Sequence, residues 1–178
     1  MRVLRVAAVA AVLSMLGLLI WDVAHSHGGK IAREVDHGEI VPAPAFSLSR
    51  VEGGSKLSLA SLRGKVVVIN FWASDCIPCK QEQKMLNAAA SHWSGKGVVF
   101  LGIDEVDLRG PAKAYMKHYG VAYPSVYDGT GTLAGKFGVT GTPETFFVDR
   151  RGRVIPPHII ARTERADVDA GIKRALKA

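Results

Sequence analysis

Residues 64–79 have the sequence Gly64-Lys-Val-Val-Val-Ile-Asn-Phe-Trp-Ala-Ser-Asp-Cys-Ile-Pro-Cys79. From Val66 to Trp72 every residue except Asn70 is apolar, and most are β-branched. Such a run is typical of a strand that is buried on both faces of a sheet. Apolar residues then recur at helical spacing over residues 79–93. The stretch therefore predicts a buried strand followed by a helix, with Cys76 and Cys79 at their junction.

The chain contains only these two cysteines. A structural zinc site needs four ligands, and no second cysteine or histidine pair at a suitable spacing accompanies them. A structural disulfide would close a very short loop and would stabilise little. A catalytic dithiol needs two sulfurs that bond in one redox state and part in the other, with one exposed at a helix start. The sequence favours this third interpretation.

A mechanism follows from the predicted junction. The amino terminus of a helix favours a thiolate at Cys76, which attacks a partner disulfide. Cys79 then attacks Cys76 and releases the reduced partner, while Pro78 is tolerated in the first helical turn. The carboxylate of Asp75 disfavours the thiolate and so predicts greater reducing power. The alternative is that Asp75 only caps the helix.

A second feature is the segment Gly138-Val-Thr-Gly-Thr-Pro143, which precedes a predicted strand at residues 144–148. A proline that opens a buried strand gives up a ladder donor. An ordinary turn would keep the bond trans. Beside the cysteine pair, we expect a cis Thr142–Pro143 bond lying against Cys76, with the backbone of Thr142 free to pair with a partner's extended segment.

The remaining patterns predict an α/β fold with a sheet of mixed direction. A hairpin is expected over residues 46–59, and Thr163 is expected to cap the last helix. Further strands are predicted at 98–103, 125–127 and 153–155, and helices at 110–119 and 132–137.

The amino-terminal residues predict export. Arg2 and Arg5 precede an uncharged apolar run, which favours an amino terminus that stays inside. The run is intermediate in length between a signal-peptide core and a full membrane span. We predict a signal-anchor at 1–23, a linker at 24–41 and one domain at 42–178. The alternative is a secreted protein whose signal is removed near Ala24-His25-Ser26.

Charge and histidine content exclude other classes. The formal net charge is +7, but the basic residues are dispersed, so nucleic-acid binding is not expected. His25, His27 and His37 lie in the predicted linker without a cysteine or carboxylate cluster, so no metal site is expected there. No cofactor is predicted.

Three segments carry a family resemblance: residues 64–74, the Cys76-Ile-Pro-Cys79 motif, and Gly138-Val-Thr-Gly-Thr-Pro-Glu-Thr-Phe147. Together they resemble the TlpA/ResA/CcmG family of anchored, extracytoplasmic thioredoxin-like proteins, over roughly residues 42–178. The resemblance implies a thioredoxin-like fold with an amino-terminal β-hairpin extension. It also implies Cys76 as nucleophile, Cys79 as resolving cysteine and a cis Pro143.

The Pro-Glu-Thr-Phe form resembles the branch that reduces apocytochrome c before haem attachment. It implies Glu144 as an acidic residue near the active site, exported disulfide-containing proteins as partners, and a membrane electron donor for re-reduction. Two positions depart from the family. Residue 75 is Asp where Trp is usual, and no acid lies between the cysteines.

Several alternatives remain open. The chain could act as a general disulfide oxidant or reduce other partners. A thiol peroxidase would need Thr or Ser three residues before its reactive cysteine, where this chain has Ala73. A copper chaperone usually has a wider cysteine spacing and a distant histidine, although His118 and His158 are present.

Overall fold

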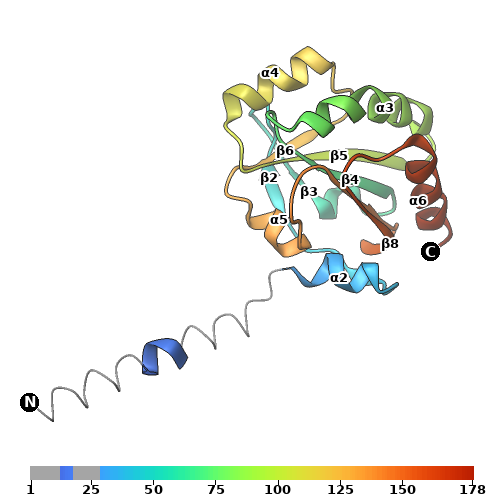
Figure 1. The fold of residues 1–178 in the computed structure, drawn as a ribbon. Coiled ribbons are helices and arrows are strands. Elements are labelled where there is room, and N and C mark those ends of the chain that lie inside the picture. The colour runs from blue at the N-terminus through green and yellow to red at the C-terminus, as the bar shows by residue number, and fades with distance from the viewer. Residues whose placement is uncertain (1–12, 18–28) are drawn as a thin grey trace, which may run out of the picture.

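The computed structural model describes residues 13–17 and 29–178 (Figure 1). Its strands are β1 (Val41–Pro42), β2 (Ser47–Ser49), β3 (Lys56–Ser58), β4 (Val66–Trp72), β5 (Val98–Glu105), β6 (Ser125–Asp128), β7 (Glu144–Val148) and β8 (Arg153–Ile160). Its helices include α2 (Lys30–Asp36), α3 (Ile77–Trp93), α4 (Arg109–Tyr119), α5 (Thr132–Phe137) and α6 (Arg165–Lys177), and a 3₁₀ turn spans Leu59–Leu62.

The central sheet has six strands in the order β1-β8-β7-β4-β5-β6. Strands β4, β5 and β6 run parallel, whereas β7, β8 and β1 each pair antiparallel with their neighbours. The predicted mixed sheet is therefore confirmed. In the parallel pair, Trp72 at the end of β4 lies opposite Asp104 of β5.

Helices cover both faces of this sheet, which explains why β4 is buried along its whole length. In Figure 1, α3 and α4 lie above the sheet and α2 and α5 lie below it. Val66 and Val68 pack with residues of α3 and α6 in one core cluster. Ile69 and Phe71 pack with residues of α2 and α5 in another. Alternate residues of a strand point to opposite faces, so one apolar run supplies both cores.

The amino-terminal hairpin is also confirmed. Strands β2 and β3 form a separate two-stranded sheet in which Leu48 pairs with Leu57. A single bridge between Arg50 and Val126 joins the hairpin region to β6.

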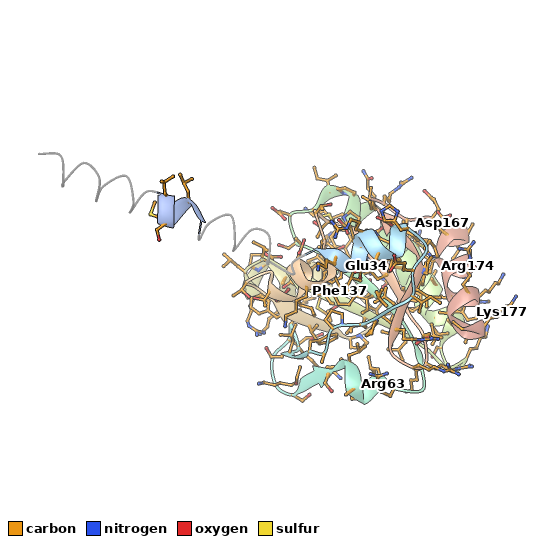
Figure 2. The ribbon with its side chains drawn as sticks, turned by 90° about the horizontal axis from the view of Figure 1, so that it is seen from below. Glu34, Arg63, Phe137, Asp167, Arg174 and Lys177 are labelled. Atoms are coloured by element: carbon orange, nitrogen blue, oxygen red, sulfur yellow. A yellow bond between two sulfur atoms is a disulfide. The ribbon has the colours of Figure 1, made fainter. Side chains whose placement is uncertain are left out.

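The predicted linker at 24–41 is wrong for the part that the structure describes. Residues Lys30–Asp36 form α2, in which Ala32 and Val35 are buried. The helix packs on β8 and α5, and Figure 2 shows it, with Glu34 labelled, beside Phe137 of α5. Two helical turns are too short to show a clear apolar period. Such a helix depends on tertiary packing for its stability, which sequence pattern alone does not reveal.

Two other local expectations need correction. The N-cap of α6 is Glu164, and Thr163 instead donates its backbone N–H to Glu82 Oε2 at 2.8 Å. Strand β8 continues to Ile160, well past the predicted end at residue 155. Pairing shifts register beyond Ile155, where Pro156 and Pro157 supply no N–H donors, and the bond between these prolines is cis.

Most of the predicted signal-anchor, together with Ala24–Ser26 and His27, lies outside the described residues. Residues 13–17 are helical. Within the described ranges, no helix is long and apolar enough to cross a membrane.

Candidate active site

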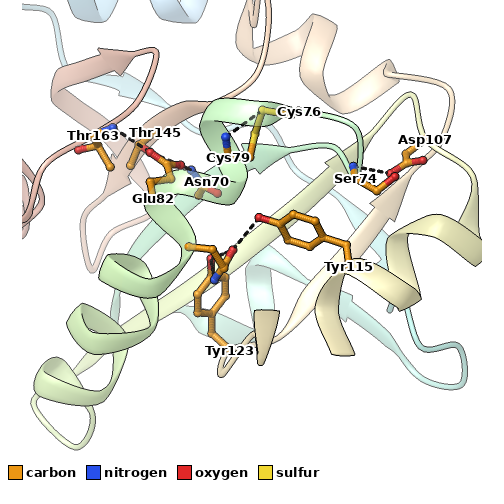
Figure 3. Close-up of a disulfide and its surroundings, with 11 residues drawn as sticks. Asn70, Ser74, Cys76, Cys79, Glu82, Asp107, Tyr115, Tyr123, Thr145 and Thr163 are labelled. Carbon is orange, nitrogen blue, oxygen red and sulfur yellow. Dashed lines mark hydrogen bonds between the residues drawn. A yellow bond between two sulfur atoms is a disulfide. The ribbon is translucent and has the colours of Figure 1, made fainter. Parts of the chain in front are cut away.

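The two cysteines lie where the sequence predicts, between the end of β4 and the start of α3 (Figure 3). They form a disulfide. Cys76 is half-buried and is the N-cap of α3, and its Sγ accepts the backbone N–H of Cys79 at 3.1 Å. Cys79 is only 1% exposed. One sulfur is thus reachable from solvent and rests at a helix amino terminus, while the other is enclosed.

The turn before Cys76 is fixed by hydrogen bonds from two backbone N–H groups. The N–H of Cys76 donates to Ala73 O at 3.3 Å, and the N–H of Ser74 donates to Asp107 Oδ2 at 2.7 Å. Asp75 is exposed in this turn. Since Cys76 itself occupies the N-cap, the alternative that Asp75 caps the helix is wrong.

A buried acid lies one helical turn beyond Cys79, and the sequence analysis missed it. Glu82 is 2% exposed, and its two carboxyl oxygens accept hydrogen bonds from Asn70 Nδ2 at 3.0 Å and from the Thr163 N–H at 2.8 Å. Burial raises the pKa of Glu82 to about 7, against the opposing effect of these two donors. Residues three apart share a helix face, so Glu82 lies on the same side of α3 as Cys79.

Two signals could have identified Glu82. One is its spacing from Cys79 at the start of an amphipathic helix. The other is Asn70, the only polar residue in the buried strand, which must find a hydrogen-bond partner inside the protein.

Aromatic side chains enclose Cys79 on its inner side. Cys79 belongs to a core cluster with Trp72 and Tyr115, whose rings stack with centroids 4.6 Å apart. The Tyr115 hydroxyl donates to Gln83 Oε1 at 3.3 Å, as does the Tyr123 hydroxyl. Burial raises the pKa of both tyrosines well above the usual value, so both stay neutral.

The Thr142–Pro143 bond is cis, as predicted. Pro143 is buried and Thr142 is half-buried. The expectation that this bond lies against Cys76 stays a prediction.

Glu144, which follows the cis proline, is buried in a different environment from Glu82. One oxygen accepts from the N–H and hydroxyl of Thr140 at 2.8 and 2.9 Å and from the Gly141 N–H at 3.2 Å. The other lies 2.8 Å from His158 Nε2. Burial favours the neutral acid, but the hydrogen bonds from His158 and Thr140 outweigh it and lower the pKa of Glu144.

The side chains of Glu144 and Glu82 lie on opposite faces of the sheet. Thr145 contacts Asn70 on the Glu82 side at 3.2 Å, and the preceding residue of a strand points the other way. Glu144 accordingly faces His158, whose ring stacks on Phe146 and whose Nδ1 lies 3.2 Å from Asp36 of α2. Of these two glutamates, Glu82 is therefore the one on the dithiol face.

The two histidines named in the copper-chaperone alternative make separate contacts elsewhere in the protein. His158 is engaged between Glu144 and Asp36, and His118 packs edge-on against Tyr119 in α4. Across residues 13–17 and 29–178, no three His, Cys, Asp or Glu side chains are grouped to hold a metal ion.

A mixed sheet, a disulfide across the first turn of a helix that follows a central strand, and a cis proline before the adjacent strand together define a thioredoxin-like thiol–disulfide oxidoreductase. Residues 41–156 match the AhpC/TSA family, and the chain belongs to that family.

Proteins with similar sequences are named for thiol–disulfide exchange. The chain is 40% identical over 112 residues to the thiol:disulfide interchange protein DsbE of Pseudomonas fluorescens biotype C, covering 62% of this chain and 61% of that protein. It is 30% identical over 132 residues to the thiol-disulfide oxidoreductase ResA of Bacillus thuringiensis (strain Al Hakam), covering 74% and 75%.

The fold is likewise shared with solved structures. A thiol:disulfide interchange protein of the thioredoxin family from Chlorobium tepidum TLS superposes with a TM-score of 0.68 at 32% identity. The match covers 78% of this chain and 97% of that one.

Proposed function

We propose that this oxidoreductase reduces disulfides of exported polypeptides, with apocytochrome c as its substrate before haem attachment. In the first step, the Cys76 thiolate attacks a partner disulfide, forms a mixed disulfide and releases one partner thiolate. Cys79 then attacks Cys76 Sγ and expels the second partner thiolate. Two electrons pass to the partner, and the chain is left with the Cys76–Cys79 disulfide.

Apolar side chains around the disulfide are the observation that carries the choice of a polypeptide substrate. Ile77 lies between the cysteines and is 67% exposed. Val106 and Leu108, both 72% exposed, flank the Asp107 that binds the Ser74 N–H. Exposed apolar residues gathered at a reactive group favour an unfolded chain with its apolar residues still accessible.

Acidic groups around the dithiol favour the reducing direction. Asp75 precedes Cys76, and Glu82 and Asp104 are buried on the dithiol face. Negative charge disfavours the thiolate and so destabilises the reduced form, which makes the dithiol a stronger reductant. With a pKa of about 7, Glu82 also suits the task of accepting the proton that Cys79 must lose before it attacks.

Trapping tests the substrate and the cysteine roles together. Cys79→Ser, expressed as the full chain, should accumulate mixed disulfides with polypeptides that carry the Cys-x-x-Cys-His motif of c-type haem attachment. Cys76→Ser is the matched control and should trap none. Trapping of partners by Cys76→Ser would show that Cys79, and not Cys76, is the nucleophile. Trapped partners that lack the motif would exclude apocytochrome c while leaving thiol–disulfide exchange in place.

We further propose that residues 1–23 anchor the chain in the cytoplasmic membrane, with the domain on the outer side. The support is the basic start and the uncharged apolar run of the sequence. Full-length chain should stay with membranes after carbonate washing. Recovery in the soluble exported fraction, shortened by about 26 residues, would show signal cleavage instead.

A further inference from the structure

Asp104 is a buried carboxyl group on the dithiol face that the exchange reaction does not use. It is 0% exposed and lies opposite Trp72 in the sheet register. Among the residues that the structure describes, neither of its oxygens has a hydrogen-bond donor. A buried carboxylate without donors would be very costly, so the group must carry a proton or share one.

The neighbouring Asp107 supplies the acceptor for that proton. The carboxyl group of Asp107 is close enough to that of Asp104 to share a hydrogen bond once one of the two acids carries a proton. Ionised carboxylates only accept hydrogen bonds, so this contact requires one proton between the two groups. Burial raises the pKa of Asp104 to about 8, and the charge of Asp107 and its hydrogen bond contribute to the rise.

Asp107 connects this proton to the turn that presents Cys76. Its Oδ2 accepts the Ser74 N–H at 2.7 Å, and its backbone carbonyl accepts the Tyr127 hydroxyl at 2.7 Å. Arg109 lies over the Tyr127 ring, with its guanidinium carbon 4.0 Å from the ring centroid. Asp107 is thus held from two sides, and it holds Ser74 two residues before the reactive sulfur.

Close packing leaves this cluster little room to rearrange. A Cβ atom at Gly102 would overlap with Ser125 Oγ and would lie 2.7 Å from Trp72 Nε1. The charged groups that act most strongly on Asp104 are Asp107, Arg109 and Glu105. The Glu105 side chain belongs to the opposite face of β5, because neighbouring residues in a strand alternate.

We propose that Asp104 and Asp107 form an acid pair that shares one proton and positions the turn carrying Cys76. With the proton present, the pair has a single negative charge, and Asp107 keeps its contact with Ser74. Loss of the proton places two negative charges at the base of the turn. These charges repel each other and disfavour the neighbouring thiolate. Both aspartates act as positioning residues, and the inference does not depend on which protein is the redox partner.

The direct test follows the Ser74 amide resonance of the full-length chain by NMR between pH 6 and 9.5. We expect its chemical shift to titrate with a midpoint near 8, the pKa of Asp104. Asp104→Asn mimics the protonated acid and can still donate to Asp107, so it should abolish this titration. Glu105→Gln, the same change on the opposite face, should leave it intact. A flat Ser74 resonance in the wild type would overturn the proposal without requiring any variant to fold.

Thiol reactivity provides a second readout. In the reduced wild-type chain, the alkylation rate of Cys76 by iodoacetamide, divided by its thiolate fraction, should fall about threefold as the pair loses its proton, because the turn then holds the sulfur less firmly. Asp104→Asn should retain the higher rate across the range. Asp104→Ala, which removes the donor, should lower the rate at every pH. An Asp104→Asn profile with the same fall as the wild type would refute the role of Asp104.

Discussion

Glu82 and Glu144 are two glutamates of similar burial on opposite faces of the same sheet, yet their acidities shift in opposite directions. They are 2% and 1% exposed, respectively. The pKa of Glu82 is raised to about 7, whereas that of Glu144 is lowered. Burial favours the neutral acid at both positions, so burial alone does not decide which form is present.

The difference lies in the donors that surround each group. Glu82 has two N–H donors, from Asn70 and Thr163. Glu144 has His158 together with three donors from Thr140 and Gly141. Glu144 is therefore held as an anion that joins the cis-proline segment to His158. Glu82 can gain or lose a proton near neutral pH on the face that carries the dithiol.

The same substitution at both positions provides the strongest test of this contrast. Glu144→Gln should lower the free energy of unfolding at pH 7 by about 3 to 5 kcal/mol, because it removes a buried charge and leaves donors unpaired. Glu82→Gln should not lower it at pH 7, since Gln resembles the protonated acid and avoids the cost of ionising a buried group. Urea denaturation at constant pH measures both values. Equal losses would show that the donors do not distinguish the two sites.

The pH dependence of stability should have opposite signs at the two sites. The raised pKa of Glu82 gives a contribution that is fully present below pH 4.5 and is lost as the pH rises to about 7. The lowered pKa of Glu144 gives a contribution that is present above pH 4.5 and is lost in more acidic solution.

Unfolding curves of the wild type and Glu82→Gln should accordingly diverge by up to about 3 kcal/mol between pH 4.5 and 7. The wild type should gain relative stability toward the acidic end. A constant difference across this range would mean that Glu82 is ionised throughout. Asp104 contributes with the same sign as Glu82, so Asp104→Asn must be compared in parallel.

An exposed acid beside the dithiol should matter least. Asp75→Asn removes the charge next to Cys76 and should raise the reduction potential by about 10–20 mV, because it favours the thiolate and stabilises the reduced form. Equilibration in glutathione buffers measures the potential. Identical potentials for variant and wild type would show that Asp75 does not affect the reduction potential, which would leave the buried acids as the groups that set it.

Periodic and spaced features of this molecule could be predicted from the sequence. The apolar run at 66–72 places β4, the two cysteines mark the helix junction, and the proline at 143 indicates its cis bond. These features depend on local chemistry, such as a missing ladder donor or a helix start. Each can be recognised from a few consecutive residues of the sequence.

Features made by distant contacts could not be predicted in this way. Asn70 meets Glu82 and Thr163 only after β4, α3 and the segment before α6 have come together. Asp104 becomes a buried acid beside Asp107 only once the chain has folded around the end of β5. The helix α2 forms on a surface supplied by α5 and β8, so its seven residues carry too weak a pattern to be recognised alone.

The packing of α2 also determines where the chain can be cut. A truncated protein that starts at residue 42, the boundary suggested by sequence, would remove Ala32 and Val35 from one core and Asp36 from His158. Loss of α2 would expose apolar side chains of that core to solvent and promote aggregation. A shortened form that begins at Gly29 keeps this cover, so the smallest independent unit is longer by 13 residues than the sequence boundary implies.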